Sequence, residues 1–66
     1  MKKRLLMSTG SKDSFIKNIR QYYFVSPKES IRLNKSGTVS RTINGKWKVY
    51  NDITWEIKKG RYRLVY

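Results

Sequence analysis

The spacing of apolar residues changes near residue 31, from a helical repeat to strict alternation. The earlier stretch, residues 12–24, has its apolar residues at an i, i+1, i+4, i+7, i+8 spacing that draws one stripe on a helix. From Ile31 onward apolar and polar residues alternate, as in strands with one buried face. We therefore predict an α+β fold with one N-terminal helix packed on a four- to five-stranded antiparallel meander. A strongly twisted sheet of this size has a small curled barrel as its alternative form.

The ends of the predicted helix carry suitable residues. Ser11 can cap its start, and Asp13 lies in the first turn, where the helix dipole favours an anion. Arg20 lies toward the other end, where the dipole favours a cation. Pro27 restricts the backbone before it, so we expect the helix to end by about Phe24.

The length of 66 residues allows one domain, near the lower limit for a fold held by a hydrophobic core. The chain has no cysteine and no histidine, so we predict no disulfide, no metal and no cofactor. Within the single domain 1–66 we expect a flexible basic arm at 1–4, the helix at 12–24 and the meander at 31–66. Stability then has to come from packing, to which nine aromatic residues contribute.

The last hairpin has a register that its apolar residues specify. A two-residue turn at 59–60 pairs Trp55 with Leu64 and Ile57 with Tyr62 on one face. The charged residues between them then share the opposite face. We predict this register for the C-terminal hairpin.

The preceding hairpin contains Asn44-Gly45, which suggests another two-residue turn. That register would place Trp47 opposite Thr42 and mix polar with apolar residues on each face. A three-residue loop at 43–45, with its glycine in the left-handed bulge position, keeps the apolar residues together. We therefore predict the bulged hairpin.

Three further segments complete the predicted sheet. A three-residue loop at 50–52 would set Trp47 beside Trp55, and so continue one apolar face. Residues 31–33 are expected to add a short strand, and residues 5–7 an edge strand. One helix followed by such a bent meander resembles Sm-like and SH3-like barrels, an analogy that carries no site information.

The outer face of this predicted sheet is basic and rich in hydroxyl groups. Alternation assigns to it Arg32, Thr38, Ser40, Thr42, Lys46, Lys48, Tyr50, Thr54, Glu56, Lys58, Arg61 and Arg63. The whole chain has 16 lysines and arginines against four acidic residues, a net charge of +12. Such an imbalance costs stability through self-repulsion, which favours a counter-charged partner.

We predict that the chain is a small basic nucleic-acid-binding protein, for DNA or RNA, that engages phosphates through this outer face and the N-terminal arm. The predicted contacts are Lys2, Lys3, Arg4, Lys46, Lys48, Tyr50, Lys58, Arg61 and Arg63. Tyr50 is the expected base-stacking ring, because the tryptophans fall on the apolar face. Lys17 and Arg20 on the solvated side of the helix are further candidates. Two structural alternatives stay open: the cations protect an exposed sheet from edge pairing, and the arm is a frayed terminus.

Two other functions remain open. The same basic face would fit an acidic host protein that the chain binds and modulates, as a phage-encoded protein would. Abundant Lys, Asn, Ile and Tyr suit an AT-rich genome, and so small a basic protein suits a phage. The closing segment Tyr62-Arg63-Leu64-Val65-Tyr66 resembles the core strand of RelE-type toxin ribonucleases, and this resemblance implies mRNA cleavage by basic and aromatic residues.

Residue types argue against an enzyme, because histidine, cysteine, paired carboxylates and a glycine-rich phosphate loop are all missing. The three apolar residues after the first basic cluster are too few for an export signal. No apolar run approaches the roughly 18 residues of a membrane span. We therefore expect a cytoplasmic protein that has no membrane partner.

Overall fold

The computed structural model describes residues 4–66, which form one helix and six strands joined by turns and short loops. In chain order they are β1 (Leu5–Thr9), α1 (Lys12–Tyr22), β2 (Ile31–Leu33), β3 (Val39–Ile43), β4 (Lys46–Tyr50), β5 (Thr54–Lys58) and β6 (Arg61–Val65). The α+β class, the helix and the predicted edge strand at the N-terminal end are confirmed. No helix among the described residues is long and apolar enough to cross a membrane.

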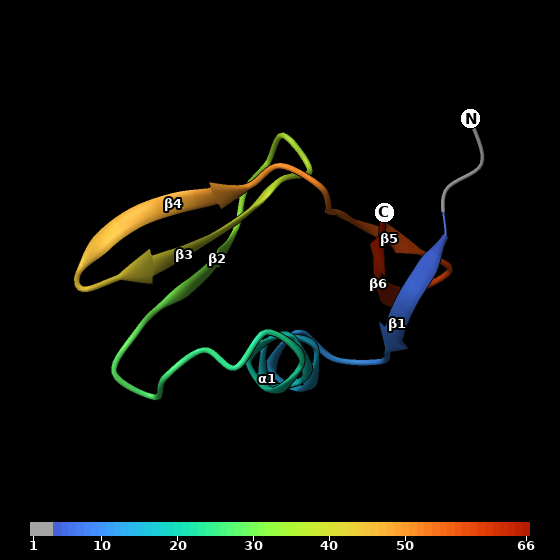
Figure 1. Cartoon of the computed structure of the whole chain (residues 1–66). Coiled ribbons are helices and arrows are strands. Elements are labelled where there is room, and N and C mark those ends of the chain that lie inside the picture. Colours follow the sequence, from blue (N-terminus) through green and yellow to red (C-terminus); the bar gives the residue numbers. More distant parts are fainter. Residues whose placement is uncertain (1–3) are drawn as a thin grey trace.

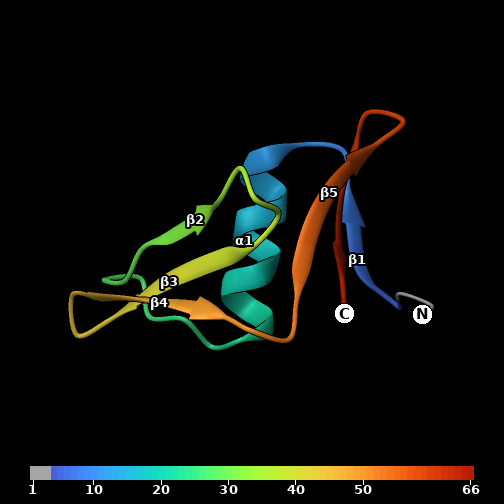
Figure 2. The same cartoon turned by 90° about the horizontal axis from the view of Figure 1, so that it is seen from above.

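The strands form two antiparallel sheets, not one meander. One sheet has the order β1-β6-β5 and the other β2-β3-β4, and α1 lies between them on one side (Figures 1 and 2). The predicted pairing across residues 50–52, which set Trp47 beside Trp55, is wrong. The chain instead crosses from β4 to the other sheet, with Ile53 only 2% exposed in the core. The sheets are not closed into a barrel.

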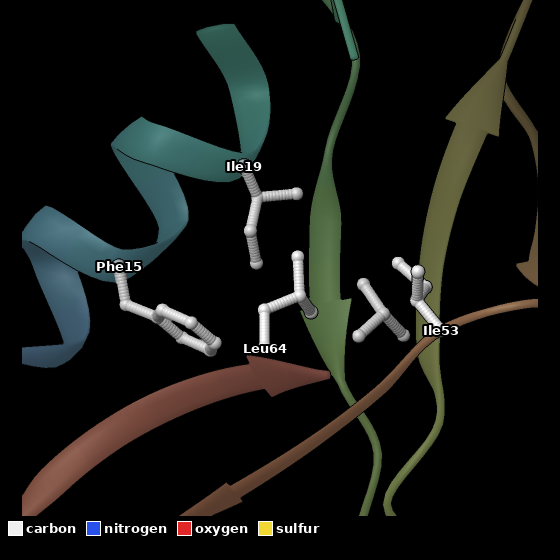
Figure 3. Packing of buried hydrophobic residues seen from close by; sticks show 5 residues of the cluster. Phe15, Ile19, Ile53 and Leu64 are labelled. Carbon is white, nitrogen blue, oxygen red and sulfur yellow. The ribbon is translucent and has the colours of Figure 1, made fainter. Parts of the chain in front are cut away.

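A small apolar core joins the helix to both sheets. Phe15 and Ile19 point from α1 toward Leu64 of β6 and toward Ile53, and Val39 of β3 completes this cluster of buried residues (Figure 3). Phe15, Ile19, Val39 and Leu64 have no exposed surface. Each such side chain contributes roughly 1.5–3 kcal/mol when fully buried, so this cluster holds the two sheets and the helix together.

Trp55 also links the sheets through hydrogen bonds. Its backbone N–H donates to the carbonyl oxygen of Gly37 at 2.8 Å. Its indole Nε1–H donates to the carbonyl oxygen of Asn34, also at 2.8 Å. Because both acceptors lie in the turn between β2 and β3, these bonds tie β5 to the β2-β3-β4 sheet.

Helix α1 begins and ends with recognisable caps. The Ser11 hydroxyl accepts from the N–H of Ser14 at 3.2 Å, as predicted. At the other end, the N–H of Val25 donates to Arg20 O at 2.9 Å and that of Phe24 to Gln21 O at 3.4 Å. This pattern is a Schellman motif, which requires a left-handed residue. Here that residue is Phe24, with φ 54°.

Phe24 occupies a position that usually carries glycine, and its side chain is 91% exposed. Left-handed backbone costs a residue with a Cβ about 1–2 kcal/mol, and glycine's extra unfolded-state entropy offsets about 0.5–1 kcal/mol of any gain. We expect Phe24→Gly to raise the free energy of unfolding by about 0.5–1 kcal/mol, measured by urea denaturation. Phe24→Ala retains the Cβ and serves as control; an equal gain in both variants would contradict the explanation by backbone strain.

The C-terminal hairpin has the predicted register. Trp55 pairs with Leu64 and Ile57 with Tyr62 across a turn in which Lys59 and Gly60 have φ 53° and 76°. Positive φ at both central residues is the signature of a type I′ turn, whose twist matches that of the strands.

The bulged register predicted for the other hairpin is wrong. Thr42 pairs with Trp47, and the turn consists of Asn44 and Gly45 alone, with φ 53° and 80°. Asn-Gly adopts this type I′ geometry at low cost. The turn therefore overrides the apolar alternation, and every side chain of β4 lies on the face opposite to the predicted one.

Candidate nucleic-acid interface

The outer face of the β1-β6-β5 sheet carries a cluster of cations. Because Leu64 and Tyr62 face the core, alternation places the intervening residues of β6 on the opposite face. A shallow depression of about 310 Å³ lies there, lined by Leu5, Ser8, Lys58, Lys59, Arg61 and Arg63. We call its four cations, Lys58, Lys59, Arg61 and Arg63, the basic surface.

Two contacts hold the arginines of the basic surface. Arg61 donates from Nε to the Ser8 hydroxyl at 2.9 Å and from Nη2 to the Ser8 carbonyl oxygen at 3.2 Å. Arg63 Nε lies 3.6 Å from Glu56 Oε2. The bonds to Ser8 use two of the five N–H donors of a guanidinium, so Arg61 retains donors for an anion.

The β3–β4 hairpin projects away from the β1-β6-β5 sheet, as Figure 2 shows, and its two faces differ. Arg41 pairs with Lys48, and Lys46 with Ile43, on the face that carries Val39 and therefore looks toward the core side. The outer face carries Trp47, which is 46% exposed. The hairpin thus has cations on one face and an exposed aromatic ring on the other.

Arg32 of β2 packs on this exposed ring. Its guanidinium carbon lies 4.5 Å from the centroid of the Trp47 ring, a cation–π contact. Next to them, Ser40 and Thr42 are buried polar residues whose hydroxyls bond within the protein, to Asn34 and Glu29. The outer face of this sheet therefore has a fixed polar base beneath an aromatic ring.

Tyr50 is not the exposed ring that we predicted. It pairs with Val39, and its ring centroid lies 4.6 Å from that of Tyr23. Its hydroxyl oxygen is buried. Burial, with smaller contributions from Asp52, Tyr22 and Tyr50, raises the pKa of Tyr23 to about 12. Tyr50 therefore belongs to an aromatic cluster at the end of the helix.

The N-terminal arm is only partly described. Lys2 and Lys3 lie outside the described residues. The backbone of Arg4 exchanges two hydrogen bonds of 2.9 Å with that of Tyr66 and extends the β1–β6 ladder. Arg4 is thus held beside the C-terminal residue, with an exposed side chain.

The two candidates on the helix differ in their contacts. Lys17 is exposed. Arg20 is half-buried, and its Nη1 donates to Ser26 O at 2.7 Å and to Glu29 O at 2.9 Å. Arg20 therefore fixes the segment between α1 and β2, a structural role.

The structure brings together some of the predicted contacts and separates others. Lys58, Arg61 and Arg63 share one face, as predicted, whereas Lys46 and Lys48 lie on the core-side face of the other sheet. Sequence reasoning missed Lys59 and Trp47 as members of the exposed surfaces, whereas it placed Arg32 on the outer face, where the structure has it. The Asn-Gly dipeptide was the signal for Trp47, because its preferred two-residue turn places that ring outward.

Comparison of the chain with protein-family models, curated proteins and solved structures finds no match. Function is therefore inferred from the side chains themselves.

Glu29 fixes the tip of the β3–β4 hairpin. Its carboxylate accepts from the Thr42 hydroxyl at 2.7 Å and from the N–H groups of Asn44 and Gly45 at 2.8 and 3.3 Å. The bond from Thr42, then that from Asn44, lowers the pKa of Glu29 below its ordinary 4.5. Both amides of the turn are thus held by one charged acceptor.

This contact predicts an acid-sensitive hairpin tip. The stabilisation by Glu29 is fully present above its ordinary pKa of 4.5 and is lost as pH falls through the lower value in the folded protein. We expect the amide NMR shifts of Asn44 and Gly45 to titrate with a midpoint below 4.5. Glu29→Gln should abolish that titration; if the midpoint stays in the variant, another acid is responsible.

Proposed function

We propose that the protein binds nucleic acid and does so without catalysing a reaction, with phosphates on the basic surface. The observation that carries the proposal is the convergence of four cations around one depression, and among the described residues only Arg63 of these four is paired with a carboxylate, that of Glu56. Phosphate is recognised by such clusters, by lysine as a point charge and by arginine also as a bidentate donor.

Charge on the whole chain supports the same conclusion. The net charge of +12 exceeds what solubility of a small domain requires, which is a magnitude of roughly 2–8. A nucleic acid presents a regular row of negative charges and releases bound counterions when cations replace them. This gain offsets the self-repulsion of so many positive side chains.

The positions of Arg61 and Arg63 add geometry to this charge. Their contacts with Ser8 and Glu56 hold both guanidinium groups on the surface of β6, so less side-chain entropy is lost on binding. Lys58 and Lys59 lie at the neighbouring type I′ turn and are exposed. The basic surface therefore combines two arginines held by neighbouring side chains with two exposed lysines.

The test is fluorescence-anisotropy binding to short duplex DNA, single-stranded DNA and RNA across a salt series, with nuclease-treated protein. We expect steep salt dependence on duplex DNA, with a slope near −0.9 for each phosphate neutralised. Lys58→Gln with Lys59→Gln should reduce the slope by up to about 1.8. When Arg61 and Arg63 are also replaced by Gln, the total reduction should reach up to about 3.6.

A variant with the same charge separates the site from net charge. Four exposed lysines away from the basic surface, Lys12, Lys17, Lys28 and Lys35, are changed to Gln to remove four charges. If both fourfold variants lose the same affinity and slope, binding has no preferred surface and the placement is wrong. Absence of binding to all three nucleic acids at low salt would overturn the function and direct attention to an acidic protein partner.

A further inference from the structure

The edge strand β4 has a feature that phosphate binding does not use. Trp47 is 46% exposed and Val49 51% exposed on the outer face of the sheet. Large aromatic side chains bury 150–250 Å² each when packed, so leaving one at the surface forfeits stability. The type I′ turn places Trp47 there, and Arg32 packs on it at 4.5 Å.

The Trp47 ring is held in place. Arg32 of β2 packs against it and leaves it 46% exposed, and Thr42 lies directly opposite it across β3–β4. The hydroxyl of Thr42 is itself engaged with Glu29, whose carboxylate also accepts from the turn amides. The Glu29 carboxylate is thus engaged in hydrogen bonds within the protein. Arg32, by contrast, places a positive charge against the Trp47 ring.

Cations flank the same ring along the strand. Lys46 and Lys48 precede and follow Trp47, are both exposed, and project to the opposite face of an edge strand that pairs only with β3 among the described strands. Residues two apart in a strand are separated by roughly 7 Å. Their long side chains can reach around the open edge, with the ring between them.

A second copy of this chain fits the edge poorly. Antiparallel pairing of two β4 strands would bring Lys46 and Lys48 of one copy close to those of the other, and each chain carries +12. A matching ligand has flat aromatic faces and negative charges at regular intervals. Unpaired nucleotides have both, whereas duplex bases are already stacked on one another.

We propose that β4 binds a single-stranded segment of nucleic acid, with one base stacked on Trp47 and the adjacent phosphates contacting Lys46, Lys48 and Arg32. This inference rests on the proposed function and adds to it the strandedness of the ligand. The basic surface supplies affinity for any nucleic acid, and Trp47 supplies the preference for unpaired bases.

The experiment compares a 12-nucleotide oligothymidylate with a 12-base-pair duplex, using the full chain and both anisotropy and tryptophan fluorescence. Trp47→Ala should weaken binding to the single strand roughly 5- to 150-fold, from the usual contribution of one stacked base. Duplex affinity should stay within about twofold of the parent. The salt slope should not change, because no phosphate contact is removed. Trp47→Phe should restore most of the loss and Trp47→Leu should not, since a base needs a flat ring.

Two controls separate stacking from folding and from charge. Ile43→Ala removes an exposed apolar side chain, 40% exposed, from the other face of the same hairpin and should leave both affinities unchanged. Lys46→Gln with Lys48→Gln should reduce the single-strand slope by about 1.4, at about 0.7 per phosphate. If Trp47→Ala fails to fold, tryptophan fluorescence provides the test instead. Oligothymidylate should quench the fluorescence of the parent protein and should not quench that of Trp47→Phe, in which Trp55 is the remaining tryptophan.

The outcomes distinguish the two proposals. This inference is overturned if single strand and duplex bind equally and Trp47→Ala changes neither affinity. If the basic surface is still required for binding, the proposed function stays intact. Failure to bind either nucleic acid overturns both. Quenching of Trp47 by polyglutamate at the same charge concentration, equal to that by oligothymidylate, would assign the ring to an acidic polypeptide.

Discussion

A core of five buried residues holds this protein together, because neither three-stranded sheet could bury its own apolar face alone. Phe15 and Ile19 of the helix meet Leu64 from one sheet and Val39 from the other, with Ile53 at the crossing between them. Chains of this size bury a smaller share of their surface than larger domains do, so each core position carries much of the stability. The rest of the surface contributes less to stability and can therefore carry charged side chains.

Two short turns control which residues reach that surface. Both are type I′, and in both a glycine follows a residue with left-handed backbone, Asn44 in one turn and Lys59 in the other. In the C-terminal hairpin the turn agrees with the apolar alternation, so Trp55 and Leu64 face inward. In the other hairpin the turn opposes it, and Trp47 faces outward. Glu29 holds this second turn by binding its amides with a carboxylate.

The positive charges are consequently divided between two surfaces with different surroundings. On the β1-β6-β5 sheet, Arg61 and Arg63 are held by neighbours around a shallow depression. On the β3–β4 hairpin, Lys46 and Lys48 precede and follow a half-exposed indole, against which Arg32 packs. The first arrangement suits phosphates of any nucleic acid, and the second adds an aromatic face suited to an unpaired base.

Much of this was predictable from local patterns. The helix with its Ser11 cap, the edge strand and the 55–64 pairing all follow from interactions between residues near in sequence or from an unambiguous apolar face. The cluster of Lys58, Arg61 and Arg63 follows from the same pairing. The predicted outward position of Tyr50 was wrong because it depended on the register of a different hairpin. Arg20 gave no local sign of its bonds to the segment that follows the helix.

The sequence by itself determined the elements, the excess of positive charge and the face of every residue in the C-terminal hairpin, since short-range periodicity and turn chemistry agree there. Tertiary structure decided the division into two sheets, and its contacts stabilise the outward position of Trp47 that the local Asn-Gly turn sets. The reason is that burial of Ile53 and the contacts of Glu29 and Arg32 join segments distant in sequence. The free energy of these contacts, together with that of the Asn-Gly turn, exceeds what is gained by placing all apolar residues of the strands on one face.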